Sequence, residues 1–142
     1  MTKYPEPVVG GYVLNDKNQV LLIRSPKWNR GKMWLVAGGH VEVGETIEAA
    51  IKREIKEELG IEIKFERVFM VFEGIYPPEF YQKRHFIYLQ CLCRIKPGEV
   101  VKVDGREIIE AKWWDIDKAL ELPDGWLHEK TREALKILAR KI

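Results

Sequence analysis

Cysteine is scarce in this sequence, with Cys91 and Cys93 the two that occur among 142 residues. They alternate along an apparent strand and therefore point to one face of it. No further cysteine is present to complete a set of ligands, so the two neighbouring thiols make a poor zinc site. We expect both to be small core residues of a protein from a reducing compartment.

Long apolar runs and a strong excess of either charge are also missing. No run approaches the length needed to span a bilayer, and residues 1–10 have no apolar core of signal-peptide length. The 24 basic and 22 acidic residues leave a net charge of +2, so no global field attracts a polyanion such as DNA. We therefore expect a cytoplasmic protein with no membrane association and no stable nucleic-acid partner.

The length of the chain limits the number of domains. With 46% hydrophobic residues, 142 residues can bury one sizeable core and are too few for two ordinary ones. We predict a single domain over residues 1–142. The oligomeric state stays open between a monomer and a homodimer.

Strand and helix patterns alternate in an order typical of an α/β protein. Residues rich in β-branched and aromatic side chains predict strands over 8–14, 20–24, 33–37, 61–75, 81–95 and 111–114. Helices are expected from Thr46 to Gly60, briefly after Asp115, and over 127–142. The last helix carries one apolar face, formed by Leu127, Thr131, Ala134, Leu135, Leu138 and Ile142. A mixed sheet with helices on both faces buries all these elements.

The first long helix places its carboxylates where an ordinary amphipathic helix would not. At about 100° per residue, Glu54, Glu57 and Glu58 occupy an arc of about 100° that overlaps the apolar stripe. Lys52 and Lys56 point away from that arc. Crowded carboxylates on the core side are costly unless they are protonated, paired with cations or bound to metal. Metal binding and a charged helix edge with Arg53 paired to Glu57 both account for this pattern.

The surrounding residues decide between these two interpretations. They match at every fixed position the pattern G-x5-E-x7-R-E-U-x-E-E-x-G-U, where U is a bulky aliphatic residue. The matching residues are Gly39, Glu45, Arg53, Glu54, Ile55, Glu57, Glu58, Gly60 and Ile61. A chance match is on the order of 10⁻⁹ or less per starting position. The chain thus resembles the Nudix hydrolase family, with a complete Nudix box.

This resemblance implies a fold and a chemistry. The fold is an α/β/α sandwich with a mixed sheet between helices, and Glu54, Glu57 and Glu58 bind catalytic Mg²⁺, with Mn²⁺ as a second option. In such enzymes a water attacks one phosphorus of a diphosphate, assisted by metal and by a glutamate base. Arg53 would orient a glutamate. Glu45 is expected to brace the loop before the helix, with metal binding as the alternative.

Two further site residues are sought outside the box, where the resemblance is less specific. In several Nudix enzymes a glutamate from a downstream loop completes the metal site or acts as base. Glu107 and Glu110 compete for that role, and we favour Glu107 because its polar loop could bend over the helix. Arg24 resembles family arginines that hold a substrate phosphate, although an exposed cation at a strand end is an equal interpretation.

Four other residues are predicted to contact the substrate. Gly38 and Gly39 offer a backbone that a metal ion or phosphate could approach closely. Trp28 and Phe80 bring aromatic rings near cationic groups, as stacking on a nucleobase requires. Simple packing of these aromatic rings is the alternative.

The predicted function is cleavage of the diphosphate linkage of a nucleotide, with a nucleoside monophosphate as product. A nucleoside triphosphate is the preferred substrate, because so compact a chain leaves little room for an added dimerisation domain. Pro77 and Pro78 lean instead toward ADP-ribose, since a proline at about this distance from the box resembles a marker of ADP-ribose hydrolases. Nucleotide sugars and dinucleoside polyphosphates are further options, and a non-catalytic nucleotide- or RNA-binding module is the alternative of another class.

Overall fold

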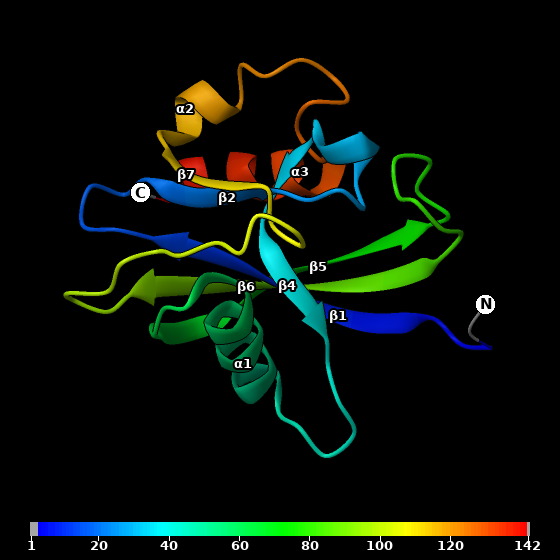
Figure 1. Ribbon diagram of the computed structural model, residues 1–142, viewed down its shortest axis with the longest axis horizontal. Helices are drawn as coiled ribbons and strands as arrows, with labels where there is room; N and C mark the ends of the chain where they lie inside the picture. Colours follow the sequence, from blue (N-terminus) through cyan, green and yellow to red (C-terminus); the bar gives the residue numbers. More distant parts are fainter. Residues whose placement is uncertain (1–2, 142) are drawn as a thin grey trace.

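A seven-stranded mixed sheet forms the middle layer of the structure, a computed structural model that describes residues 3–141 (Figure 1). Its strands are β1 (Glu6–Leu14), β2 (Val20–Arg24), β3 (Trp34–Leu35), β4 (Ala37–His40), β5 (Ile63–Ile75), β6 (His85–Ile95) and β7 (Glu110–Trp114). The main path through the sheet runs β3-β2-β1-β6-β5, while β4 pairs with β1 and β7 with β2. β1 and β6 run parallel and the other pairs run antiparallel, so the mixed sheet predicted from the sequence is confirmed.

Helices cover both faces of this sheet. Helix α1 (Ile47–Leu59) lies on one face, and α2 (Ile116–Ala119) and α3 (Glu129–Ala139) lie on the other (Figure 1). A 3-10 turn, η1 (Asn29–Gly31), follows β2. Helix α1 begins and ends as predicted: the Thr46 hydroxyl accepts a hydrogen bond from the Ala49 N–H at 3.0 Å, and Gly60 closes the helix in the left-handed conformation at φ 69°.

Alternation along the strands produces two cores, one on each face of the sheet. In β1, Val9 and Val13 join the core under α1, whereas Tyr12 and Leu14 join the core under α3. Helix α1 contributes Ala50, Ile51, Ile55 and Leu59 to the first core, and each is at most 1% exposed. This packing fixes the rotation of α1 about its axis and therefore the direction of its carboxylates.

The predicted strand over 33–37 is wrong in its boundaries. The chain leaves β2 after Leu35 and crosses at Val36 to a different neighbour, so β3 pairs with β2 and β4 with β1. Strand β4 also extends through Gly38 and Gly39, which pair with Gly10 and Val9. Glycine disfavours a strand interior, and this tertiary pairing outweighs that preference. The crossing brings the first residues of the box against the centre of the sheet.

The boundaries of two further elements also differ from the prediction. Strand β6 begins at His85, because residues 76–84 form the turn and loop after β5, with Phe80 bridged to Trp28. Helix α3 begins at Glu129, capped by the His128 ring, so Leu127 precedes it and pairs with Trp34. Thr131, Ala134, Leu135 and Leu138 are buried as predicted, while Ile142 lies outside the described residues. Within residues 3–141, no helix is long and apolar enough to cross a membrane.

The packing of α1 leads to a stability prediction. Ile55→Ala should lower the free energy of unfolding by about 2–5 kcal/mol, because it leaves a cavity beneath a fully buried side chain. The adjacent Lys56→Ala should change it by less than about 1 kcal/mol, since that side chain is half exposed and forms a surface pair with Glu62. Urea unfolding of both variants measures the difference, and equal losses would contradict the observed rotation of α1.

Candidate active site

Helix α1 turns two of its three box glutamates toward the sheet. Taking Ile51 as the centre of the buried stripe, Glu58 lies about 20° and Glu54 about 60° from it, whereas Glu57 lies about 120° away. The structure follows these angles, with the Glu54 side chain 16% exposed and that of Glu57 60% exposed. The prediction that all three face inward is therefore corrected for Glu57, which stands on the solvent side of the helix edge.

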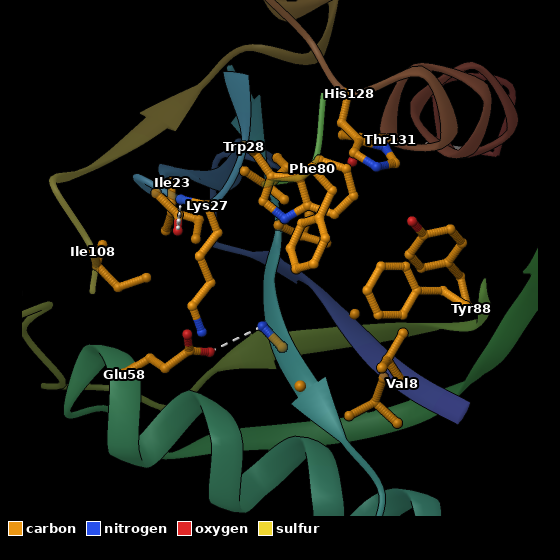
Figure 2. Close-up of a pocket in the computed structure, with 18 of the residues that line it drawn as sticks. Val8, Ile23, Lys27, Trp28, Glu58, Phe80, Tyr88, Ile108, His128 and Thr131 are labelled. Carbon is orange, nitrogen blue, oxygen red and sulfur yellow. Dashed lines mark hydrogen bonds between the residues drawn. The ribbon is translucent and has the colours of Figure 1, made fainter. Parts of the chain in front are cut away.

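Glu58 ties α1 to strand β4. Its Oε1 accepts a hydrogen bond from the backbone N–H of Gly38 at 3.0 Å (Figure 2). Burial, together with repulsion from Glu54 and Glu107, raises the pKa of Glu58 to about 8 against the opposing effects of the hydrogen bond and the Lys27 charge. The Lys27 side chain extends toward the Glu58 carboxylate (Figure 2). A buried carboxylate thus faces both a cation and two other acids.

Glu54 lies directly on the backbone of Gly39. A Cβ atom at position 39 would come within 2.5–2.6 Å of the Glu54 carboxyl atoms, so a side chain there would displace the carboxylate. The glycine at this position of the box pattern therefore has a steric reason in this chain, because it leaves room for the Glu54 carboxylate. The same contact sets Glu54 beside Glu58 against the middle of β4.

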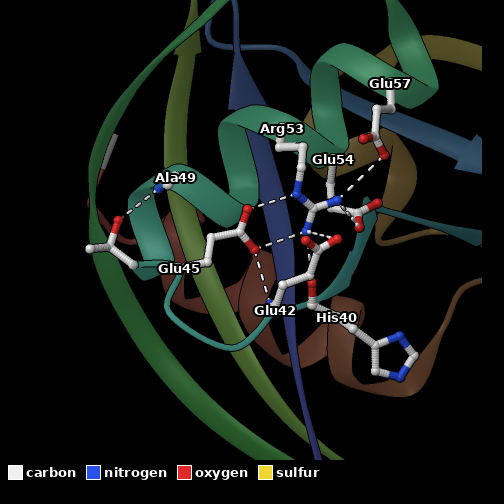
Figure 3. A network of polar contacts seen from close by, with 8 residues as sticks. His40, Glu42, Glu45, Ala49, Arg53, Glu54 and Glu57 are labelled. Carbon is white, nitrogen blue, oxygen red and sulfur yellow. Dashed lines mark hydrogen bonds and ion pairs between the residues drawn. The ribbon is translucent and has the colours of Figure 1, made fainter.

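Arg53 organises the acidic loop before α1 (Figure 3). Its guanidinium makes two bonds to Glu45, at 2.7 and 2.9 Å, and donates to the His40 carbonyl at 3.0 Å. It also contacts Glu54 at 2.8 Å and Glu57 at 3.4 Å. The paired guanidinium holds the pKa of Glu45 at about 2.

These contacts give Arg53 and Glu45 a positioning geometry. Arg53 links Glu54 to the loop of Glu45 and does not itself line the cavity. The Glu45 carboxylate also accepts from the Glu42 N–H at 3.0 Å, so the loop is braced at both ends. The arrangement is consistent with bracing by Glu45 and with orientation of Glu54 by Arg53.

The acidic residues suit a divalent cation in their chemistry. Within residues 3–141, no three acidic, histidine or cysteine side chains converge closely enough to form a preassembled metal site. Glu54 and Glu58 are held by Arg53 and by the Gly38 N–H instead. Their carboxylate oxygens are nevertheless the ligands that Mg²⁺ prefers, and a cation between them would relieve the repulsion that raises the Glu58 pKa. The donor set therefore fits a hard metal ion.

A cavity of about 190 Å³ opens beside these carboxylates (Figure 2). Its charged end contains Lys27, Glu58 and Glu107 beside the backbone of Gly38 and Gly39. Its other end is aromatic or neutral, lined by Trp28, Phe80, Phe86, Tyr88, Gln90, His128 and Thr131. A ligand that fits both ends would be anionic at one end and flat and apolar at the other.

The two competing glutamates of the downstream loop have different surroundings. Glu107 lines the cavity, and Asp104 Oδ1 holds its loop by accepting from the N–H groups of Arg106 and Glu107. Glu110 instead pairs with Arg24 at 2.8 Å. Arg24 also donates to the Gly31 carbonyl at 2.6 Å and does not line the cavity. The geometry thus favours Glu107 over Glu110, while a phosphate role for Arg24 would require it to leave two partners.

Trp28 and Phe80 both line the cavity, with ring centroids 4.6 Å apart. Trp28 is 8% exposed and also packs edge-on against His128 at 4.6 Å, so it belongs to the core as well. Replacing it would therefore cost stability in addition to any contact with a substrate. The stacking role of the pair stays a prediction.

Sequence reasoning did not assign Tyr88, Gln90, His128 or Thr131 to the site. Tyr88 and Gln90 are two residues apart and lie on the same face of β6. His128 caps the start of α3, and Thr131 lies in its first turn. One signal was available, since Gln90 is a polar residue inside the otherwise apolar run Tyr88 to Cys93. The pattern alone could not indicate that this face of β6 meets the start of α3.

Comparison with known proteins identifies the family. A profile of the NUDIX domain matches residues 4–135. The MutT NUDIX hydrolase from Burkholderia pseudomallei superimposes with a TM-score of 0.77 at 26% identity, covering 94% of this chain and 98% of that one. A MutT protein from Methanosarcina mazei Go1, at 23% identity and TM-score 0.77, shares the fold over 99% and 98% of the two chains. The chain belongs to the Nudix hydrolase family, as its sequence predicted.

Sequence relatives are named as hydrolases of two kinds. NAD-capped RNA hydrolase NudC of Vibrio atlanticus is 35% identical over 123 residues, which are 85% of this chain and 41% of that protein. Nudix hydrolase 5 of Arabidopsis thaliana is 28% identical over 133 residues, or 92% of this chain and 42% of the relative. The chain thus spans about two-fifths of the length of the curated relatives it matches.

The His128 ring at the cavity wall generates a pH prediction. Burial, with a smaller effect of the Lys130 charge, lowers the pKa of His128 to about 4, against 6.5 for an unperturbed histidine. The unfolded chain therefore binds more protons between these values, so stability is fully present above pH 6.5 and declines as the pH falls toward 4. His128→Asn, which keeps a capping side chain, should remove this part of the decline. Thermal unfolding of both proteins at pH 7 and pH 4.5 measures it, and parallel losses would contradict it.

Proposed function

We propose that this chain is a Mg²⁺-dependent pyrophosphohydrolase that cleaves the diphosphate linkage of a nucleotide and releases a nucleoside monophosphate. The observation that carries the proposal is the divided cavity, with carboxylates and a lysine at one end and aromatic rings at the other. A nucleotide has the matching division, because its phosphates are anionic and its base is flat and neutral. The complete acidic set of the box favours catalysis over a purely binding module.

The roles proposed for the residues follow from their positions. Glu54, Glu57 and Glu58 would hold Mg²⁺, or Mn²⁺, at the charged end. When bound, the metal ion neutralises charge on the phosphoryl oxygens and lowers the pKa of a coordinated water. Glu107 would accept the proton of the attacking water or complete the ligand set, and Arg53 would keep Glu54 in place. The Gly38 and Gly39 backbone would lie beside the diphosphate.

A nucleoside triphosphate is the first candidate substrate, with ADP-ribose, other nucleotide sugars and dinucleoside polyphosphates as alternatives. Relatives named NAD-capped RNA hydrolases support a further candidate, a substrate that carries a dinucleotide such as NAD. The net charge of +2 still favours a small nucleotide over a stable nucleic-acid partner. A cytoplasmic protein that acts as a monomer or homodimer remains our expectation.

A substrate panel tests the proposed function. Purified protein with Mg²⁺ is incubated with nucleoside triphosphates, ADP-ribose, other nucleotide sugars, dinucleoside polyphosphates, NAD and a short NAD-capped RNA, and the products are identified by chromatography. Release of a nucleoside monophosphate from one class identifies the substrate. An absence of turnover across the whole panel would favour the binding-module alternative and reject the proposed activity.

Substitution of the innermost carboxylate should cause a large loss of activity. Glu58→Gln is expected to lower kcat/KM at least about 100-fold, above the 10- to 100-fold typical of changes in residues that only support a metal ligand. The reason is that metal occupancy falls when one anionic ligand becomes neutral. Excess Mg²⁺ should restore only part of the rate, which a titration of kcat against Mg²⁺ concentration measures.

Lys56→Gln provides the matched control on the opposite side of α1. Lys56 is half exposed and pairs with Glu62 at the surface, so its removal should leave the Mg²⁺ titration unchanged. Equal and small effects of the two substitutions would remove Glu58 from the metal site.

A further inference from the structure

The neutral end of the cavity contains buried polar atoms that have no hydrogen-bond partner in the described part of the chain. Gln90 is 3% exposed, and its buried Oε1 has no hydrogen-bond partner within residues 3–141. The buried hydroxyl of Tyr88, two residues earlier on the same face of β6, has none either. Both side chains line the cavity. Buried polar groups are almost always satisfied in folded proteins, so two unpaired groups on one cavity wall indicate a site built for a polar ligand.

The backbone is shaped to admit the Gln90 carboxamide. Gly10 is the register partner of Gln90 across the parallel β1–β6 pair. A Cβ atom at position 10 would lie 2.7 Å from Gln90 Oε1 and 3.1 Å from a methyl group of Val36. Glycine at this position therefore lets the carboxamide lie across β1 at the cavity wall. Any larger residue would push the amide out of its place.

A third polar group approaches from α3. The Nδ1 atom of His128 accepts a hydrogen bond from the Lys130 N–H at 3.1 Å, so the neutral ring carries its proton on Nε2. No residue in the described part of the chain accepts from that nitrogen. His128 and Thr131 stand above Tyr88 on the far side of the cavity from Glu58 (Figure 2). The Tyr88 and His128 ring centroids are 5.6 Å apart.

The surroundings of these groups select a flat, uncharged ligand. Trp28, Phe80 and Phe86 form a continuous aromatic cluster next to them, with centroid separations of 4.6–6.3 Å. The charged residues of the lining are Lys27, Glu58 and Glu107, and none of these belongs to the aromatic cluster. A carboxamide offers a donor and an acceptor side by side, which complements the edge of a nucleobase.

We propose that Gln90, seated against Gly10, reads the hydrogen-bonding edge of the substrate's base and is the specificity-determining residue of this enzyme, with Tyr88 and His128 as additional contacts. This inference rests on the proposed function, because it assumes that the diphosphate occupies the end near Glu58. The proposed function concerns the diphosphate that is cleaved, and this inference adds how the enzyme would select the base of its substrate.

Binding of nucleoside 5′-monophosphates without metal tests the assignment, because it does not depend on which diphosphate is hydrolysed. For the unaltered protein, titration calorimetry with AMP, GMP, CMP and UMP should show at least a tenfold spread in Kd. Gln90→Leu should reduce that spread to less than about threefold, since the preferred base loses its paired partner. Ribose 5-phosphate, which lacks a base, should bind both proteins equally.

Two further variants separate recognition from folding. Gly10→Ala should displace the carboxamide and reproduce the loss of selectivity while Gln90 is still present. Gln19→Leu is the matched control, because it makes the same substitution in the turn between β1 and β2, where Gln19 bonds Asp115. It should leave the spread in Kd unchanged. Gln90→Leu should also raise the Tm of the ligand-free protein, since it removes an unsatisfied buried amide.

The outcomes distinguish this inference from the proposed function. Retention of the full spread by Gln90→Leu, or no base preference in the unaltered protein, would overturn the role of Gln90 and leave hydrolysis untouched. A lower Tm with equal weakening of all four monophosphates would assign Gln90 a structural role and also overturn it. Base-selective binding without hydrolysis of any substrate in the panel would reject the proposed activity and support the base site.

Discussion

The hydrogen bond between the Gly38 N–H and the Glu58 carboxylate is the contact on which the site depends. It joins the helix that carries the acids to the strand that supplies the glycine backbone, and it is partly buried. Glu54 rests on the neighbouring glycine, so the two carboxylates are held close despite their repulsion. The fold stabilises this crowding through the apolar side of α1, where Ala50, Ile51 and Ile55 anchor the helix.

The same strand pairing that supports the acids also builds the other end of the cavity. Strand β1 pairs with β4 on one edge and with β6 on the other. Gly10 in β1 therefore stands between Gly38 of the acidic end and Gln90 of the neutral end. The charged side chains of the cavity lie toward Gly38, and its aromatic side chains lie toward Gln90. The pairing of β1 with both strands therefore brings the two ends of the cavity together.

The family and the identity of α1 could be predicted from the sequence, because the box fixes residue types at fixed spacing on one helix. Its cap at Thr46 and its end at Gly60 depend on local chemistry and were also predictable. The outward position of Glu57 was harder to predict, since the arc of the three glutamates runs from within the buried stripe to beyond its edge. The split between β3 and β4 and the convergence of Gln90 with His128 depend on pairing between distant segments, which no local pattern contains.

The parallel pairing of β1 with β6 has a consequence for how the molecule forms. Residue 6 meets residue 86, so the central strand finds its partner roughly 80 residues later in the chain. Contacts this distant in sequence form slowly, because the entropy of closing a long loop opposes them until they are made. During synthesis, β1, β4 and the acidic helix emerge well before β6. The surface that would select a base, which includes Tyr88 and Gln90 of β6, is therefore complete only after this distant pairing has formed.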